Sequence, residues 1–192
     1  AMLLNSYSRI FVPPEQFALP YSLLHWRIYG PVFPKFFLKN SLKSYLIKNQ
    51  QWKLSHESSK SFVDHFINKK IKIDPLTIYD FILKYYSKVT NRDAELYGDQ
   101  SPLTTLFYKE VINNFKNSKY IFLIRNPLDV VLSYKKLRNN PASKTDFAIW
   151  KWLNSIDAYN YASTNLDRDQ VFLLKYEDLV NNSEETLTNI TR

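Results

Sequence analysis

Arg125 and Ser133 are residue types that bind phosphate, and their spacing allows both to reach one anion. Arg125 directly follows the apolar run 120–124 and comes just before a helix start, where backbone N–H groups are free. A guanidinium donates paired hydrogen bonds to phosphate oxygens. Ser133 lies about two helical turns further on and could add a hydroxyl donor. The alternative is that Arg125 pairs with Asp129 or caps the sheet edge, and that Ser133 is only a small polar helix residue.

Two further side chains follow apolar, strand-like runs. Tyr176 comes after residues 171–174 and could contact a ligand with its ring or its hydroxyl. The alternative is that Tyr176 packs and the two acids after it are solvated. Glu15 follows a short apolar run and two prolines that restrict the backbone, so its carboxylate is a candidate general base. An exposed loop acid is the alternative for Glu15. His25 has a weaker claim, because its apolar neighbours indicate a buried, structural imidazole.

The elements that must position these residues alternate between strand and helix in the second half. The runs 120–124 and 171–174 are continuous and rich in β-branched and aromatic residues, which is typical of strands buried on both faces. Helices are expected from 126, from about 146 to 163, and from 183. This order predicts an α/β fold with a parallel sheet flanked by helices. Ligands bind such sheets beyond the carboxyl ends of the strands.

The first half reads as mainly helical. A helix tail is expected over residues 1–6, a short strand over 9–12, and irregular helices over 21–86, where prolines interrupt the pattern. A further helix is expected to start at 101, with proline at its first position. Between 35 and 72, nine lysines stand against two acids, and 9 − 2 = +7 is close to the net charge of +8 for the whole chain. We expect these lysines to attract an acidic acceptor; a solvated helical face is the alternative.

Composition excludes several classes of protein. The 192 residues contain no cysteine, so disulfide scaffolds, thiolate metal sites and thiol nucleophiles are excluded. Three scattered histidines do not suggest a metal centre, and none is expected. Glycine occurs only at 30 and 98, so the chain holds no glycine-rich phosphate loop. No apolar run has the length of a membrane span. Hydrophobic residues make up 45% of the chain, which predicts a packed, globular protein.

Together these segments resemble the sulfotransferases that use 3′-phosphoadenosine 5′-phosphosulfate (PAPS), in particular the protein-tyrosine and carbohydrate branch. Residues 121–134, IFLIRNPLDVVLSY, are similar to the strand and helix that bind the 3′-phosphate in that family. Residues 175–179, KYEDL, and 97–102, YGDQSP, resemble two further family elements. Residues 1–19 are similar to the region just after the family's first motif. The resemblance implies a P-loop-like sheet with a mainly helical insert.

The resemblance also implies a role for each candidate. Arg125 and Ser133 would bind the 3′-phosphate of the nucleotide, Tyr176 would contact the nucleotide, and Glu15 would act as the catalytic base. PAPS would be the co-substrate, and no metal would be required. The implied reaction is transfer of a sulfuryl group to a hydroxyl or amine of an acceptor, such as a small molecule, a glycan or an acidic peptide. We expect no nucleic-acid partner, no membrane span and a cytoplasmic location.

The sequence departs from the family pattern in three places. The family's 5′-phosphosulfate loop would end a few residues before Ala1, so we expect an N-terminally truncated member. Gln100 stands where lysine is usual, and Leu137 where one branch has a second phosphate-binding arginine; Lys136 or Arg138 could substitute. We expect one sulfotransferase-like domain over residues 1–192. Its lysine-rich insert would cover about 20–90 and its 3′-phosphate half about 97–192.

Other functions remain open from the sequence. A P-loop kinase would need a lysine-bearing glycine loop and Mg²⁺-binding carboxylates, and the chain shows neither. A basic nucleic-acid-binding module would explain the charge, but the aromatic residues fall mostly at core spacing. The third alternative is a non-catalytic, nucleotide-binding remnant of the sulfotransferase fold.

Overall fold

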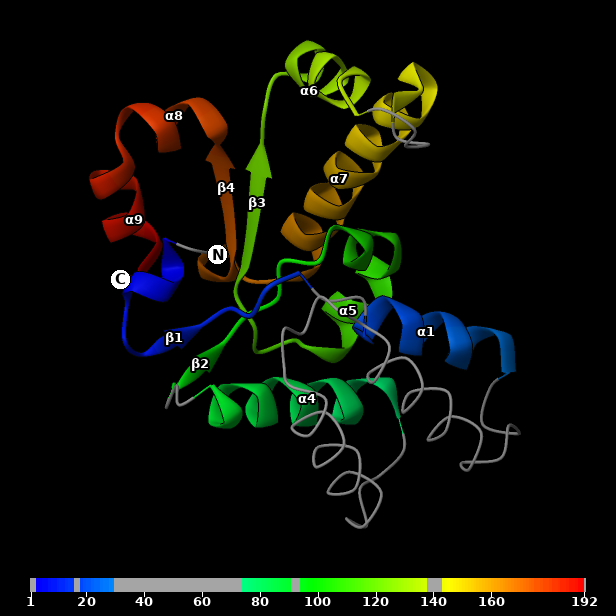
Figure 1. The fold of residues 1–192 in the computed structure, drawn as a ribbon, viewed down its shortest axis with the longest axis vertical. Helices are drawn as coiled ribbons and strands as arrows, with labels where there is room; N and C mark the ends of the chain where they lie inside the picture. Colours follow the sequence, from blue (N-terminus) through cyan, green and yellow to red (C-terminus); the bar gives the residue numbers. More distant parts are fainter. Residues whose placement is uncertain (1–2, 16–17, 30–73, 91–93, 138–142, 192) are drawn as a thin grey trace. The chain divides into compact units, whose positions relative to one another are not determined.

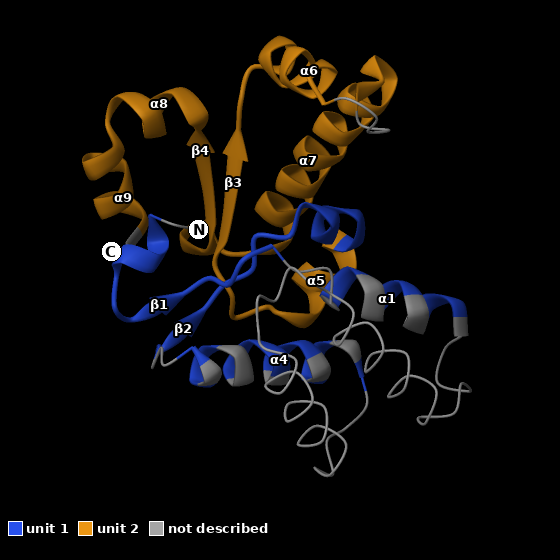
Figure 2. Cartoon of the chain, in the orientation of Figure 1, with its two compact units in different colours: residues 1–107 blue, residues 108–192 orange. Residues whose placement is uncertain are grey.

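The computed structural model describes residues 3–15, 18–29, 74–90, 94–137 and 143–191. The lysine-rich segment 35–72 and Arg138 lie outside these residues, as does the side chain of His25. Two compact units divide the chain, residues 1–107 and 108–192, and Figure 2 colours them separately. The expectation of a single sulfotransferase-like domain stays a prediction.

Unit 1 is built around a short parallel pair of strands, β1 (Ile10–Phe11) and β2 (Leu96–Tyr97), in which Ile10 is paired with Leu96 and Phe11 with Tyr97. The helices in its described part are the 3-10 helix η1 (Leu4–Ser6), α1 (Ala18–Tyr29), α4 (Pro75–Val89) and the 3-10 helix η4 (Pro102–Phe107). The short strand expected over 9–12 is confirmed as β1, and helices are confirmed at α1 and α4, whereas residues 30–73 of the expected helical stretch lie outside the described residues. Strand β2 was not expected, because two residues leave no periodicity to read.

The core of unit 1 consists of large apolar side chains. The side chain of Ile82 in α4 is fully buried, and those of Leu19 in α1 and Phe11 in β1 are nearly so. Because α4 repeats its apolar residues at helical spacing, one of its faces contributes Tyr79, Ile82 and Leu83 to this core. Burial raises the pKa of the Tyr79 phenol well above its usual range, and the nearby Asp99 carboxylate adds to this effect.

Unit 2 contains the longer parallel pair, β3 (Tyr120–Ile124) and β4 (Val171–Lys175). Its helices are α5 (Tyr108–Asn114), α6 (Pro127–Lys135), α7 (Thr145–Asn165), η6 (Arg168–Gln170), α8 (Tyr176–Asn181) and α9 (Ser183–Thr191). Figure 1 shows that β3 and β4 run in the same direction and that α6 and α8 begin just beyond their carboxyl ends. The expected α/β fold with parallel strands is confirmed.

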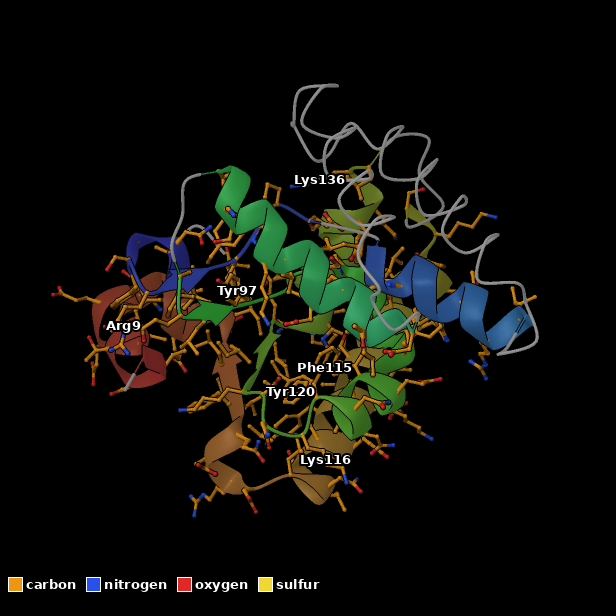
Figure 3. All side chains as sticks on the ribbon, turned by 90° about the horizontal axis from the view of Figure 1, so that it is seen from below. Arg9, Tyr97, Phe115, Lys116, Tyr120 and Lys136 are labelled. Atoms are coloured by element: carbon orange, nitrogen blue, oxygen red, sulfur yellow. The ribbon has the colours of Figure 1, made fainter. Side chains whose placement is uncertain are left out.

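Local contacts set the strand register of unit 2. Gln170, the residue before β4, donates from its side-chain amide to the backbone oxygens of Lys116 and Ser118, which precede β3. The Tyr120 hydroxyl donates to the oxygen of Phe115 at 3.0 Å, so the first residue of β3 is tied to the end of α5 (Figure 3). These bonds fix the starts of both strands. The strands then pair residue by residue, without a bulge, up to the pair Ile124 and Lys175.

Two expectations about these elements are wrong in detail. The strands β3 and β4 are not buried on both faces: Ile121, Leu123 and Leu173 are 39%, 52% and 47% exposed. Phe122, which is paired with Leu173 in the ladder, packs edge-on against Tyr159 of α7 with ring centroids 5.5 Å apart. The helix expected from residue 101 begins as the 3-10 helix η4 and becomes α-helical only at Tyr108.

Candidate functional site: a candidate anion-binding site at the ends of β3 and β4

The strand register of unit 2 brings Arg125 and Tyr176 together. Both residues directly follow the last ladder pair, Ile124 and Lys175, so they leave the sheet at the same level. The Cζ atom of Arg125 lies over the Tyr176 ring, 4.6 Å from its centroid. A guanidinium over an aromatic face is attracted by the ring quadrupole, and the contact keeps the arginine's plane in place. The sequence predicted both residues at strand ends, but it did not predict this contact.

The guanidinium of Arg125 is partly buried, and its Nε edge faces the Asp129 carboxylate. Its Nε atom is buried and, in the part of the chain that the structure describes, has no hydrogen-bond partner. The Asp129 carboxylate lies 3.7 Å from this Nε, which is close enough for an ion pair but too far for a hydrogen bond. The side chain as a whole is 38% exposed. The alternative pairing of Arg125 with Asp129 is therefore present, but at this distance it gives the buried Nε–H no hydrogen bond.

The turn from β3 to α6 has the geometry that the sequence predicts. Asn126 caps α6, since its side-chain oxygen accepts from the backbone N–H of Leu128 at 2.9 Å. Pro127 occupies the first helical turn and Asp129 follows, which suits the positive end of the helix dipole. Arg125 is thus one residue away from the cap of a nine-residue helix.

Ser133 lies in α6 and is exposed. Its hydroxyl is accessible to a ligand, and its role beside Arg125 stays a prediction. Of the residues considered as substitutes for the second arginine, Lys136 ends α6 as its C-cap and is exposed (Figure 3). Leu137, which stands at the arginine position, is also exposed.

Sequence reasoning missed Trp152. This residue of α7 donates from its indole Nε1 to the backbone oxygen of Arg125 at 3.0 Å. The neighbouring Lys151 lies over the ring of Tyr134 in α6, 5.4 Å from its centroid. A tryptophan in the middle of an apolar helix gives no signal of such a bond, because its partner is a backbone atom 27 positions away.

Glu15 belongs to unit 1 and is half-buried, whereas Arg125, Ser133 and Tyr176 belong to unit 2. The segment that leads to Glu15 is anchored on both sides. The Asn5 side chain exchanges two hydrogen bonds of 2.7 Å with the backbone of Val12. The amide of Gln100 donates to the oxygen of Pro13 at 2.9 Å. Gln100, at the position where the sequence resemblance implies lysine, therefore holds the loop that carries the candidate base.

No group of three or more His, Asp or Glu residues that could hold a metal ion occurs within the described ranges. Among the helices of those same ranges, none is long and apolar enough to cross a membrane.

Comparison with known proteins identifies the family. The model of the family described as "Sulfotransferase family" matches residues 3–192. The chain belongs to the sulfotransferase family. No protein with curated function matches it in sequence.

Two solved sulfotransferase structures share the fold. A sulfotransferase domain from the curacin biosynthetic pathway matches with a TM-score of 0.63 and 18% identity, over 98% of this chain and 65% of that one. The sulfotransferase domain of the Synechococcus PCC 7002 olefin synthase matches with a TM-score of 0.63 and 22% identity, over 98% of this chain and 64% of that one. This sulfotransferase chain therefore spans just under two thirds of the length of either structure.

Proposed function

We propose that this sulfotransferase transfers a sulfuryl group from PAPS to a hydroxyl or amine of an acceptor, and that Arg125 is the main ligand of the donor's 3′-phosphate. The family generally uses PAPS as its donor. The observation that carries the proposal is the partly exposed Arg125 guanidinium, which lies over the Tyr176 ring where β3 and β4 end. An arginine in this state has donors to offer a dianion and little freedom to lose on binding it.

The other residues take the roles that the family resemblance implies. Ser133 adds a hydroxyl to the 3′-phosphate, and Tyr176 contacts the nucleotide while it supports Arg125. The Asn126-capped start of α6 presents backbone N–H groups next to Arg125, which favour an anion. The residues present therefore fit a nucleotide with a ribose phosphate.

The reaction needs positioning and one base. The acceptor oxygen or nitrogen attacks the sulfur, the bond from sulfur to the 5′-phosphate oxygen breaks, and adenosine 3′,5′-bisphosphate leaves. Such loose transition states are stabilised mainly by alignment and by charge on the departing oxygens. Glu15 takes the proton that the acceptor loses. The anchoring of its loop by Asn5 and Gln100 supports this role, because a base must be aimed at the acceptor.

Nucleotide binding is the first experiment. The affinity for adenosine 3′,5′-bisphosphate and for adenosine 5′-monophosphate is measured by calorimetry on the wild type, Arg125→Met and Arg168→Met. Arg168 is the matched control, an exposed arginine of η6 in the same unit. We expect the wild type to prefer the bisphosphate, and Arg125→Met to weaken its binding by about 100-fold, the size of a lost charged hydrogen-bonding pair. An equal loss in both variants would contradict the proposal.

Transfer is the second experiment, with radiolabelled PAPS and two probe acceptors, de-N-sulfated heparin and an acidic tyrosine peptide. We expect Glu15→Gln to lower kcat by about 100-fold or more with little change in nucleotide affinity. Glu184→Gln, at the exposed start of α9, serves as the control.

An acceptor KM that rises with salt concentration would support an acidic acceptor. Nucleotide binding without transfer to either probe would favour the non-catalytic alternative. Tighter binding of a single-stranded oligonucleotide would favour the nucleic-acid alternative.

A further inference from the structure

Arg125 stands at a point where the sheet no longer determines its conformation. The ladder between β3 and β4 ends at Ile124 and Lys175, so the Arg125 peptide lies one residue beyond the last pair. The next fixed point is the cap of α6 at Asn126. The orientation of the carbonyl between these two points sets the backbone angles of Arg125, and hence the direction in which its side chain leaves the chain.

Trp152 fixes that carbonyl. Its indole N–H donates to the Arg125 oxygen at 3.0 Å, from the middle of the 21-residue helix α7. The indole is partly buried, and a partly buried carbonyl without this donor would lose a hydrogen bond. The bond thus attaches the strand-to-helix turn to the longest helix of unit 2.

The same stretch of α7 also contacts α6. Lys151 lies over the Tyr134 ring, and Tyr134 is the residue next to Ser133. Both segments that carry the candidate phosphate ligands are therefore held by neighbouring residues of one rigid helix. A helix fixes such spacing better than a loop can, which is the requirement for a preorganised anion site.

We infer that Trp152 is a positioning residue for recognition of the nucleotide's 3′-phosphate: through its bond to the Arg125 carbonyl it fixes the guanidinium that Tyr176 and Asp129 flank. This inference rests on the proposed function. It assigns Trp152 no contact with the nucleotide, so the residue acts only through Arg125.

The test compares Trp152→Phe with Trp150→Phe. Phenylalanine keeps an aromatic ring but removes the N–H donor. Trp150, two positions along the same helix and 48% exposed, packs against Phe147 and controls for general effects on α7. The readout is the ratio of affinities for adenosine 3′,5′-bisphosphate and adenosine 5′-monophosphate. We expect Trp152→Phe to lower this ratio by about fivefold, in the range of one lost hydrogen bond, with the monophosphate affinity unchanged. Trp150→Phe should leave both affinities unchanged.

The possible results separate the two claims. If the wild type shows no preference for the bisphosphate, or Arg125→Met does not abolish that preference, the proposed function fails and the inference fails with it. If the preference depends on Arg125 but Trp152→Phe leaves it intact, only the role of Trp152 is refuted. An equal loss of both nucleotide affinities in Trp152→Phe indicates a merely structural residue and also refutes the inference. In an Arg125→Met background, Trp152→Phe should have no further effect on the ratio.

A measurement on the unmodified protein keeps the inference testable if Trp152→Phe does not fold. The indole N–H resonance of Trp152 is followed by NMR while each nucleotide is added. We expect the bisphosphate to shift this resonance more than the monophosphate does, because engagement of Arg125 changes the carbonyl that accepts from it. Equal shifts, or none, would refute the inference.

Discussion

The two compact units bury different kinds of side chain. Unit 1 encloses large residues, including Phe11, Leu19 and Ile82, around strands of only two residues each. Unit 2 has longer strands, but the apolar residues that are buried in its described part are mostly small, namely Ala148, Ala158 and Ala162 of α7 with Ile112 of α5. Some of its large apolar side chains, such as those of Leu128 and Leu132 of α6, are more than half exposed.

This difference indicates how each unit keeps its shape. Unit 1 depends on packing, since each large side chain removed from its core leaves a cavity. In unit 2 the candidate site depends on directional contacts, namely the ladder, the Asn126 cap, the Trp152 bond and the Arg125–Tyr176 stack. Such contacts fix directions well, which matters more to a binding site than buried area does.

The largest expected effect on stability is truncation of the core of unit 1. Ile82→Ala should lower the free energy of unfolding by about 2–5 kcal/mol, because the side chain is fully buried. Leu132→Ala, on the exposed side of α6, should change it by about 0.5 kcal/mol or less. Chemical denaturation of both variants measures the difference. Similar costs would contradict the contrast between the units.

A smaller effect is expected where β1 and β2 approach. A Cβ added at Gly98 would lie 2.9 Å from the Cγ2 of Val12, closer than side chains tolerate. Gly98→Ala should therefore lower the free energy of unfolding by about 1–3 kcal/mol. The double variant with Val12→Ala should lose less than the sum of the two single variants, since the shortened side chain makes room. Additive losses would show that Val12 is not the obstacle.

The smallest effect concerns the hydroxyl of Tyr120, one of the directional contacts of unit 2. Burial raises its pKa to about 12, above the usual value near 10. The folded state holds the Tyr120 proton more tightly than the unfolded state does. The free energy of unfolding that comes from this difference is therefore fully present below pH 10 and is lost as the pH rises towards 12. The spectrum of Tyr120→Phe, subtracted from that of the wild type, isolates the ionisation. A midpoint near 10 would contradict the burial of this hydroxyl.

Patterns local in sequence predicted much of unit 2. The apolar run 120–124 is the strand β3 to the residue, and the cap and proline at 126 and 127 open α6 as expected. The long helix is confirmed as α7, and the last helix does start at Ser183. These elements carry periodicity or capping chemistry within one segment, which is the information that a single sequence retains.

What the sequence could not predict depends on pairs of distant residues. An apolar strand has the same sequence pattern whether helices cover one of its faces or both, so the pattern did not predict the exposure of Leu123. The stack of Arg125 on Tyr176 needs the register of two strands that begin some 50 positions apart. The bond from Trp152 needs a helix to stand beside a particular carbonyl. Measurements of nucleotide affinity and of sulfuryl transfer will test the predicted roles of Arg125, Ser133, Tyr176 and Glu15.

The in-phase ladder of β3 and β4 constrains how this protein can change over evolutionary time. Successive residues of a strand point to opposite faces, so deletion of one residue from β4 would turn the side chain that follows the strand to the other side. Tyr176 would then leave Arg125 without any change in the chemistry of either residue. Many substitutions within the two strands should be tolerated, whereas a change in the length of either strand should not.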